Sequence, residues 1–298
     1  MILCFVEKGI DKMSATITIR PKGFFSKKLT LKDVLPEELS YGIPDGFERL
    51  DEGKEGEYTM LFDPENIGRG FQIRFDGATT ELHINYPNSR HDIELCYMMA
   101  QRICQLQKVD CFEYEGECVT LDRIEQIVQR DIDATVYTLQ VYAEKIRSGE
   151  SKSIIIFGAI NPFEIGEREL DIFGEDIDKF SAWLNEMQQR DVYYGVPHFY
   201  EKQDGSTFGA FAVKAGVASV MPVQPSIPLR MRNQFEVSDW YVLLGYSDGR
   251  KTGSLAMIDY SGLAEHISRG EYYDAGHAVV NLTDSDVEHL LETYAVSL

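Results

Sequence analysis

The feature that most constrains the fold of this chain is a stripe of apolar residues between residues 120 and 147, repeating every three or four positions. This spacing places the apolar side chains on one face of an α-helix. Thr120 can cap the start of the helix, and Ser148-Gly149 can end it. The stripe consists of Leu121, Ile124, Val128, Ile132, Val136, Leu139, Tyr142 and Ile146.

An apolar face of this length has to be covered, and two partners can cover it. The favoured partner is the core of the protein itself. The alternative is a second copy of the chain, which would make the protein a structural or assembly protein that oligomerises through the 120–147 helix. In that case the dominant contacts would come from Val128, Ile132, Val136 and Leu139.

The rest of the chain alternates strand-like and helix-like segments. Residues 71–86 form a hairpin pattern around Asp76-Gly77, and residues 90–107 have the spacing of an amphipathic helix. After 150, we expect a strand at 154–157 and a helix at 175–190, followed by further hairpins. A last helix is expected to start at Thr283 with a capping box.

This order of elements predicts an α+β fold of mainly antiparallel sheets with inserted helices. The Ser- and Gly-containing segment 148–153 is the predicted boundary between two subdomains, 13–149 and 151–298, joined by the long central helix. Residues 1–12 lack the alternation that begins after Met13, which favours Met13 as the native start.

The 298-residue chain is acidic, with a net charge of −20 at pH 7, and acidic residues outnumber basic ones in both halves. The electrostatic field of this negative charge repels phosphates, so we expect neither nucleic acid nor an anionic membrane as a partner. A basic protein is the favoured class of partner. A signal-peptide pattern and a membrane-spanning apolar run are both missing from the sequence. We therefore expect a cytoplasmic location.

The five cysteines include no CxxC pair, so we expect reduced thiols, no disulfide framework and no metal site. Glycine-rich nucleotide loops, HExxH and GxSxG are missing as well. The sequence therefore predicts no cofactor, and it favours a non-enzymatic protein over an enzyme.

Two histidine-containing places are the candidate catalytic sites. His91 and Asp92 lie where a strand passes into a helix, a place suited to an anionic ligand, although Ser89 or Asp92 acting as a helix cap is the favoured alternative. His198 lies in an aromatic strand and can act as a base if a carboxylate orients it, whereas a packing role is favoured. Asp274 and His277 are interpreted as a turn before a strand.

Three prolines recur at every third position in residues 222–228, and a basic residue follows with the PxxPxR spacing of a polyproline-II ligand. The candidate partner-binding residues are Pro225, Pro228 and Arg230. The favoured alternative is that the prolines stiffen a connection between strands.

Three segments together resemble an uncharacterised family of bacterial proteins, mainly from Gram-positive species. They are MSATITIRPKGFF followed by LTLKDVL, ELHINYPNSRHDIELCYMMAQRI, and YYDAGHAVVNLTDSDVEHLL. The resemblance covers nearly the whole chain from Met13, and it implies neither an activity nor catalytic residues.

The preferred functional hypothesis is a non-enzymatic acidic protein that binds a macromolecular partner, in one version as an immunity or inhibitor protein against a cationic toxin. The rival is an enzyme of unfamiliar type with a cleft between the two halves, lined by His198, Asp92 or tyrosines from the 193–200 strand. The assembly protein described above is the third hypothesis.

Overall fold

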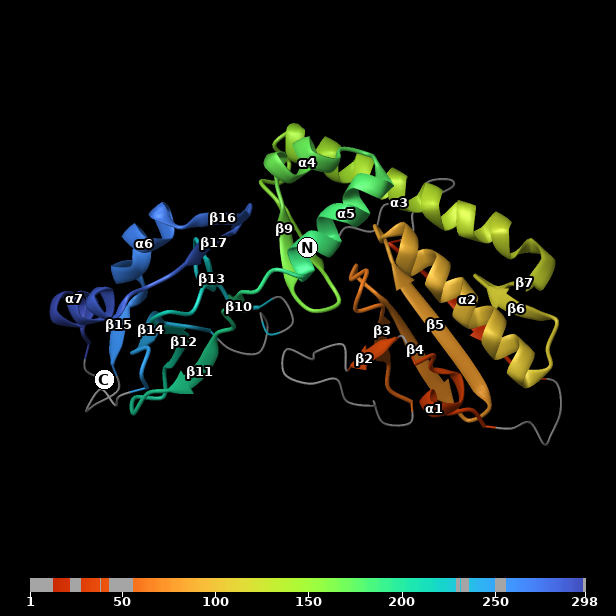
Figure 1. Cartoon of the computed structure of the whole chain (residues 1–298), viewed down its shortest axis with the longest axis horizontal. Coiled ribbons are helices and arrows are strands. Elements are labelled where there is room, and N and C mark those ends of the chain that lie inside the picture. The colour runs from red at the N-terminus through yellow and green to blue at the C-terminus, as the bar shows by residue number, and fades with distance from the viewer. Residues whose placement is uncertain are drawn as a thin grey trace. The chain divides into compact units, whose positions relative to one another are not determined.

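The computed structural model describes residues 13–21, 28–37, 39–42, 56–228, 231, 236–249 and 256–296, and all statements below refer to these residues. Two compact units make up the chain, residues 1–190 and 191–298. The boundary predicted at residue 150 lies inside the first unit. Figure 1 labels most elements of both units, and each unit is described by itself.

A seven-stranded antiparallel sheet is the centre of the first unit (Figure 1). Its middle contains the predicted hairpin, in which alternate residues such as Leu82 and Ile84 are buried and their neighbours are not. In spatial order the strands are β2 (Ser40–Gly42), β3 (Thr59–Phe62), β4 (Phe71–Asp76), β5 (Thr79–Asn85), β1 (Ser14–Ile19), β6 (Cys111–Tyr114) and β7 (Glu117–Thr120).

Helix α2 (Arg90–Gln107) lies across this sheet, and α3 (Ile124–Arg147) lies alongside α2 (Figure 1). A 3₁₀ turn, Leu121–Arg123, precedes α3, so the predicted helix at 120–147 is confirmed. A short helix, α1 (Leu31–Val34), begins after Thr30.

The apolar stripe of α3 belongs to the core of the first unit. Leu139 is 0% exposed, Ile132 is 6% exposed, and Val128 and Val136 pack partly buried against the same core. The protein's own sheet and helices thus cover much of this stripe, and the alternative of an oligomer interface through these four residues stays a prediction. The favoured alternative, a core helix, is what the structure shows.

The first unit ends in a hairpin and two helices. Strand β8 (Ile154–Phe157), at the predicted position, pairs with β9 (Pro162–Ile165), and helices α4 (Glu167–Phe173) and α5 (Ile177–Gln188) follow. Ring contacts hold them together: the centroids of Phe173 and Phe180 lie 5.1 Å apart, and those of Phe163 and Trp183 lie 5.4 Å apart. The sequence predicted the helix at 175–190 but neither β9 nor α4.

The second unit contains two four-stranded sheets. The first has the order β10 (Tyr193–Tyr194), β13 (Ser219–Pro222), β17 (His277–Val280) and β16 (Glu271–Asp274). The second has the order β11 (His198–Glu201), β12 (Thr207–Lys214), β14 (Asp239–Gly245) and β15 (Met257–Asp259). The pairs β10/β13 and β12/β14 are parallel and the other pairs are antiparallel, so the sheets are mostly antiparallel, as the α+β prediction has them.

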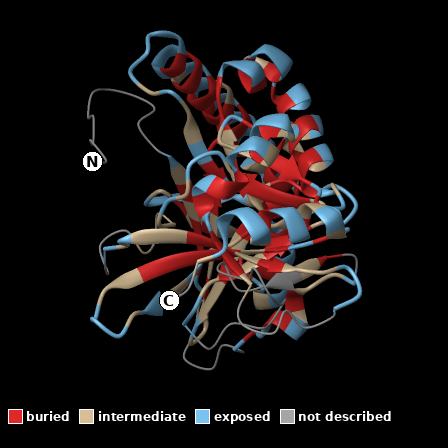
Figure 2. Ribbon diagram, turned by 90° about the vertical axis from the view of Figure 1, so that its left-hand side faces the viewer, coloured by how far each residue is buried: buried red, intermediate tan, exposed pale blue. Residues whose placement is uncertain are grey.

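The helices of the second unit are α6 (Ala264–Arg269), entered through a 3₁₀ turn at Tyr260–Leu263, and α7 (Asp284–Tyr294). The predicted capping box starts α7, with Thr283 and Asp286 exchanging bonds. Figure 2 shows buried and exposed residues alternating along the helices, with buried residues concentrated on the strands. Among the described helices, none combines the length and apolarity needed to cross a bilayer.

Candidate functional site

The start of α2, where the sequence places His91 and Asp92, contains a network of hydrogen bonds. The Ser89 hydroxyl accepts the backbone N–H of Asp92 at 3.0 Å, which is the expected capping bond. Asp92 is 0% exposed, and its Oδ2 accepts the backbone N–H groups of Arg69 at 2.8 Å and Gly70 at 3.0 Å. Burial raises the pKa of Asp92, against the effect of these donors.

The loop 66–70 closes over this network. Asn88, also 0% exposed, donates from Nδ2 to the Gly70 carbonyl at 2.8 Å. A Cβ on Gly68 would lie 2.1 Å from Asp92 Oδ2, so only glycine fits there. Arg69 donates to the carbonyl oxygens of Phe157 at 2.8 Å and Pro87 at 2.7 Å. Asp92 thus binds backbone of its own chain through Oδ2, whereas its Oδ1 is buried without a hydrogen-bond partner among the described residues.

His91 lies on the outer side of the same helix start. Its Nε2 is 2.8 Å from Oδ2 of Asp63, and its side chain is 40% exposed. Although burial acts to raise it, the pKa of Asp63 is lowered by hydrogen bonds from Glu65, Asn66 and His91. The arrangement is a partly exposed contact between His91 and Asp63 at the surface, where such contacts contribute little to stability.

The other sequence candidates lie in the second unit or outside the described residues. His198 is exposed on β11, the edge strand that pairs with β12, and it belongs to a different unit from Asp92. Pro225 and Pro228 are half-buried in an irregular stretch after β13. Arg230 lies outside the described residues. The catalytic and polyproline roles of these residues stay predictions.

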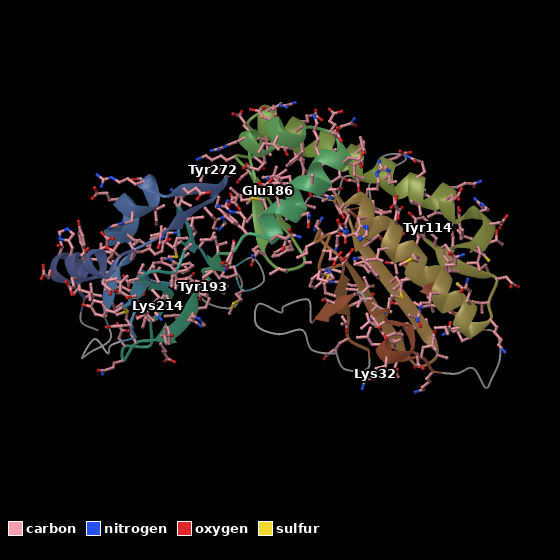
Figure 3. The ribbon with its side chains drawn as sticks, in the orientation of Figure 1. Lys32, Tyr114, Glu186, Tyr193, Lys214 and Tyr272 are labelled. Atoms are coloured by element: carbon pink, nitrogen blue, oxygen red, sulfur yellow. The ribbon has the colours of Figure 1, made fainter. Side chains whose placement is uncertain are left out.

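A second buried carboxylate, Asp131 on α3, was missed by the sequence reasoning. It is 0% exposed and accepts the phenol O–H groups of Tyr97 at 2.6 Å and Tyr114 at 2.5 Å. Tyr114 is labelled in Figure 3, and the Arg130 guanidinium lies 5.2 Å from the centre of its ring. Burial raises the pKa of Asp131. These hydrogen bonds join β6, α2 and α3 in the core and contribute to the packing of the three elements.

The second unit brings together an aspartate, a histidine and a tyrosine. Asp274 ends β16 and is 1% exposed; its Oδ1 lies 2.7 Å from Nδ1 of His277, which begins β17. The other ring nitrogen of His277, Nε2, lies 3.0 Å from the hydroxyl of Tyr194 on β10. The tautomer that satisfies both bonds carries its proton on Nδ1, so that Nε2 accepts from the phenol.

A hollow of about 480 Å³ opens beside Asp274 and His277. Asp274 and His277 line it with Tyr272, which Figure 3 labels on β16. The remaining wall is mostly apolar and comes from α6, β17 and the residues next to them and after β13: Val223, Ala264, Ile267, Ser268, Gly270, Ala275 and Ala278. The hollow is half open to solvent, so it is a surface depression and not the enclosed cavity that is usual for a small-molecule site.

Carboxylates gather on α4 and the start of α5. Residues 164–178 contain seven acidic side chains and one basic side chain. We define the acidic ledge as the five exposed members, Glu167, Asp171, Glu175, Asp176 and Asp178. Ile172 lies within the same stretch and is 51% exposed. Exposed apolar surface among charges is a common composition for a protein-binding surface.

The model of a family described as "Domain of unknown function (DUF4299)" matches residues 14–290. The expected resemblance to an uncharacterised family is confirmed by this match, whereas the bacterial and mainly Gram-positive distribution stays a prediction. No curated protein and no solved structure matches the chain.

Proposed function

We propose that this chain, which belongs to the DUF4299 family of unknown function, acts by binding a basic macromolecular partner. The observation that carries the proposal is the charge: −20 over 298 residues, with a concentration of exposed carboxylates on the acidic ledge. An acidic surface speeds the capture of a cationic protein and disfavours phosphate-bearing partners. In its more specific form, the proposal is that the protein is a cytoplasmic immunity or inhibitor protein that binds a basic toxin.

The geometry of the ledge supports this proposal in two ways. Gln140 on α3 donates to Glu175 at 2.9 Å, and Asp176 accepts two backbone N–H groups of α5, so the carboxylates project from a fixed backbone. A fixed array of charges loses little side-chain freedom on binding. The exposed Ile172 supplies apolar contact area within the same surface.

The test is capture of a partner with matched variants. Wild-type protein is immobilised at low salt with lysate of the organism that carries the gene, and the retained basic protein is then purified. Asp171→Lys with Glu175→Lys reverses two charges of the ledge. Glu288→Lys with Glu292→Lys makes the same change in net charge on α7, where both carboxylates are exposed.

The ledge variant is expected to weaken binding at least about tenfold more than the α7 variant, because local charge pairs act at short range and net charge is equal in both. Failure to retain any basic protein would overturn the proposal. Equal weakening by the two variants would remove the ledge as the contact surface.

A second candidate function rests on the trio of Asp274, His277 and Tyr194, of which Asp274 and His277 line the hollow and Tyr194 contacts His277 from β10. Here Tyr194 is the nucleophile towards an ester, His277 is the general base, and Asp274 orients the imidazole. The tyrosine oxygen bonds to the carbonyl carbon while its proton passes to Nε2, and the departing alcohol takes that proton. Water then releases the acid by the same steps. This differs from the expected cleft between the halves, which stays a prediction.

The ester p-nitrophenyl acetate is a suitable probe for this candidate. Peptide mass spectrometry is expected to place the acetyl group on Tyr194, and His277→Gln is expected to slow its transfer at least about a hundredfold. His289→Gln, an exposed histidine on α7, is the control. An absence of acetylation, or an equal rate in His277→Gln, rejects the candidate.

A further inference from the structure

Two cysteine thiols meet on the hairpin formed by β6 and β7 of the first unit. The Sγ atoms of Cys111 and Cys118 lie 2.6 Å apart. Cys118 is exposed and Cys111 is half-buried. A disulfide separates its sulfurs by about 2.05 Å, so the two atoms are within about half an ångström of a bond.

The hairpin holds the thiols in this position. The register pairs Cys111 with Thr120 and Glu113 with Cys118, which places both cysteines on the same face of the two strands. The opposite face carries Phe112 and Val119, each 1% exposed. Packing therefore anchors the hairpin from one side and leaves the thiols on the other.

The turn of the hairpin adds to this constraint. Glu115 and Gly116 both have positive φ, of 54° and 85°, the conformation of a tight two-residue turn. Glu115 also accepts the backbone N–H of Thr16 on β1 at 3.1 Å, and Glu113 forms an ion pair with Arg20. These contacts hold the hairpin against β1 and restrict the movement of strands β6 and β7.

The other two cysteines of the described residues are shielded from solvent and therefore from thiol oxidation. Cys96 and Cys104 are each 0% exposed on α2. Burial raises the pKa of Cys96 well above its usual value and raises the pKa of Cys104 to about 12. Since the thiolate is the reactive form, these two thiols are inert at neutral pH.

We propose that Cys111 and Cys118 form a modification site, oxidised reversibly to an intramolecular disulfide by a low-molecular-weight disulfide such as glutathione disulfide. The exposed Cys118 thiolate attacks a glutathione sulfur and releases one glutathione, which leaves a mixed disulfide. The Cys111 thiolate then attacks the Cys118 sulfur and releases the second glutathione. Two protein thiols are oxidised, one glutathione disulfide is reduced, and the two protons go to the released glutathiones.

The sequence supplies a direct readout. Trypsin cleaves after Lys108 and Arg123, and residues 109–123 contain both cysteines and no internal lysine or arginine. The full-length protein is incubated with excess glutathione disulfide, treated with iodoacetamide and digested. We expect this peptide to lose about 2 Da and to take up no iodoacetamide, because both thiols are in one bond.

The matched variant is Cys118→Ser, which leaves Cys111 without a second thiol; its peptide is expected to carry either one glutathione or one alkyl group. Returning the oxidised wild type to excess reduced glutathione is expected to restore two alkylated thiols. A wild-type peptide that stays a dithiol, carries glutathione, or is linked to another peptide overturns the proposal. A disulfide that resists reduced glutathione overturns its reversibility.

Discussion

Among single residues, Asp131 is the one whose buried carboxylate most affects the core of the first unit. A carboxylate at 0% exposure is costly to ionise, and two phenol donors from β6 and α2 offset part of that cost. Burial is the larger influence, and it raises the pKa of Asp131 above its ordinary value of 3.8.

The raised pKa predicts how stability changes with pH. As pH rises from about 4, the unfolded state releases the Asp131 proton before the folded state does, so unfolding becomes easier until the raised pKa is passed. The free energy of unfolding of the wild type should therefore fall with pH relative to Asp131→Asn, by about 1.4 kcal/mol for each pH unit that separates the folded pKa from the unfolded one. Urea unfolding between pH 4 and 7 measures this difference.

Asp133→Asn, an exposed carboxylate on the same helix, is the matched control for that series. A difference between wild type and Asp131→Asn that stays constant across the pH range would contradict the assignment of a raised pKa.

The contacts of single side chains are also what the sequence predicted least well. Asp131 lies beside an apolar position of a helix, and its partners Tyr97 and Tyr114 are 34 and 17 positions away. Asp274 and His277 are close in sequence, but Tyr194 joins them only because β10 and β17 flank β13 in one sheet. Such contacts depend on strand order, which periodicity does not encode.

Helix α3 shows what periodicity does encode at the scale of an element. Its stripe predicts both its length and its buried face, because one apolar face of a helix must be covered. The hairpin of β4 and β5 was predictable for the same reason. Helix α4 has 7 residues and β9 has 4, too few to establish a period.

Leu139→Ala tests whether α3 belongs to the core. Since Leu139 is 0% exposed, its truncation should lower the free energy of unfolding by about 2–5 kcal/mol. Glu144→Ala, exposed on the same helix, should change it by less than about 0.5 kcal/mol. A wild-type unfolding midpoint that rises with protein concentration would instead support an intermolecular role.

The start of α7 gives a prediction about a capping box. Thr283 accepts the N–H of Asp286 at 3.2 Å, while Asp286 accepts the N–H of Thr283 at 2.8 Å. Thr283→Ala should cost about 0.5–2 kcal/mol of stability in denaturant unfolding. Thr283→Asn, which keeps a capping oxygen, should recover most of that loss; failure to do so would show that the cap contributes little.

Across the whole molecule, charge is the property that both units share. Acidic residues exceed basic ones before and after residue 150, so the predicted preference for a basic partner does not depend on one segment. The position of the proposed contact surface could not be predicted from the sequence, because the exposure of the acidic ledge follows from the packing of α4 and α5.

The most direct measurement of the central claim is the dissociation constant of the captured basic partner as a function of salt. If exposed carboxylates guide and hold the partner, binding should weaken at least about tenfold between roughly 50 and 500 mM salt, because the Debye length shrinks across that range. An affinity that does not change with salt would contradict charge as the basis of recognition.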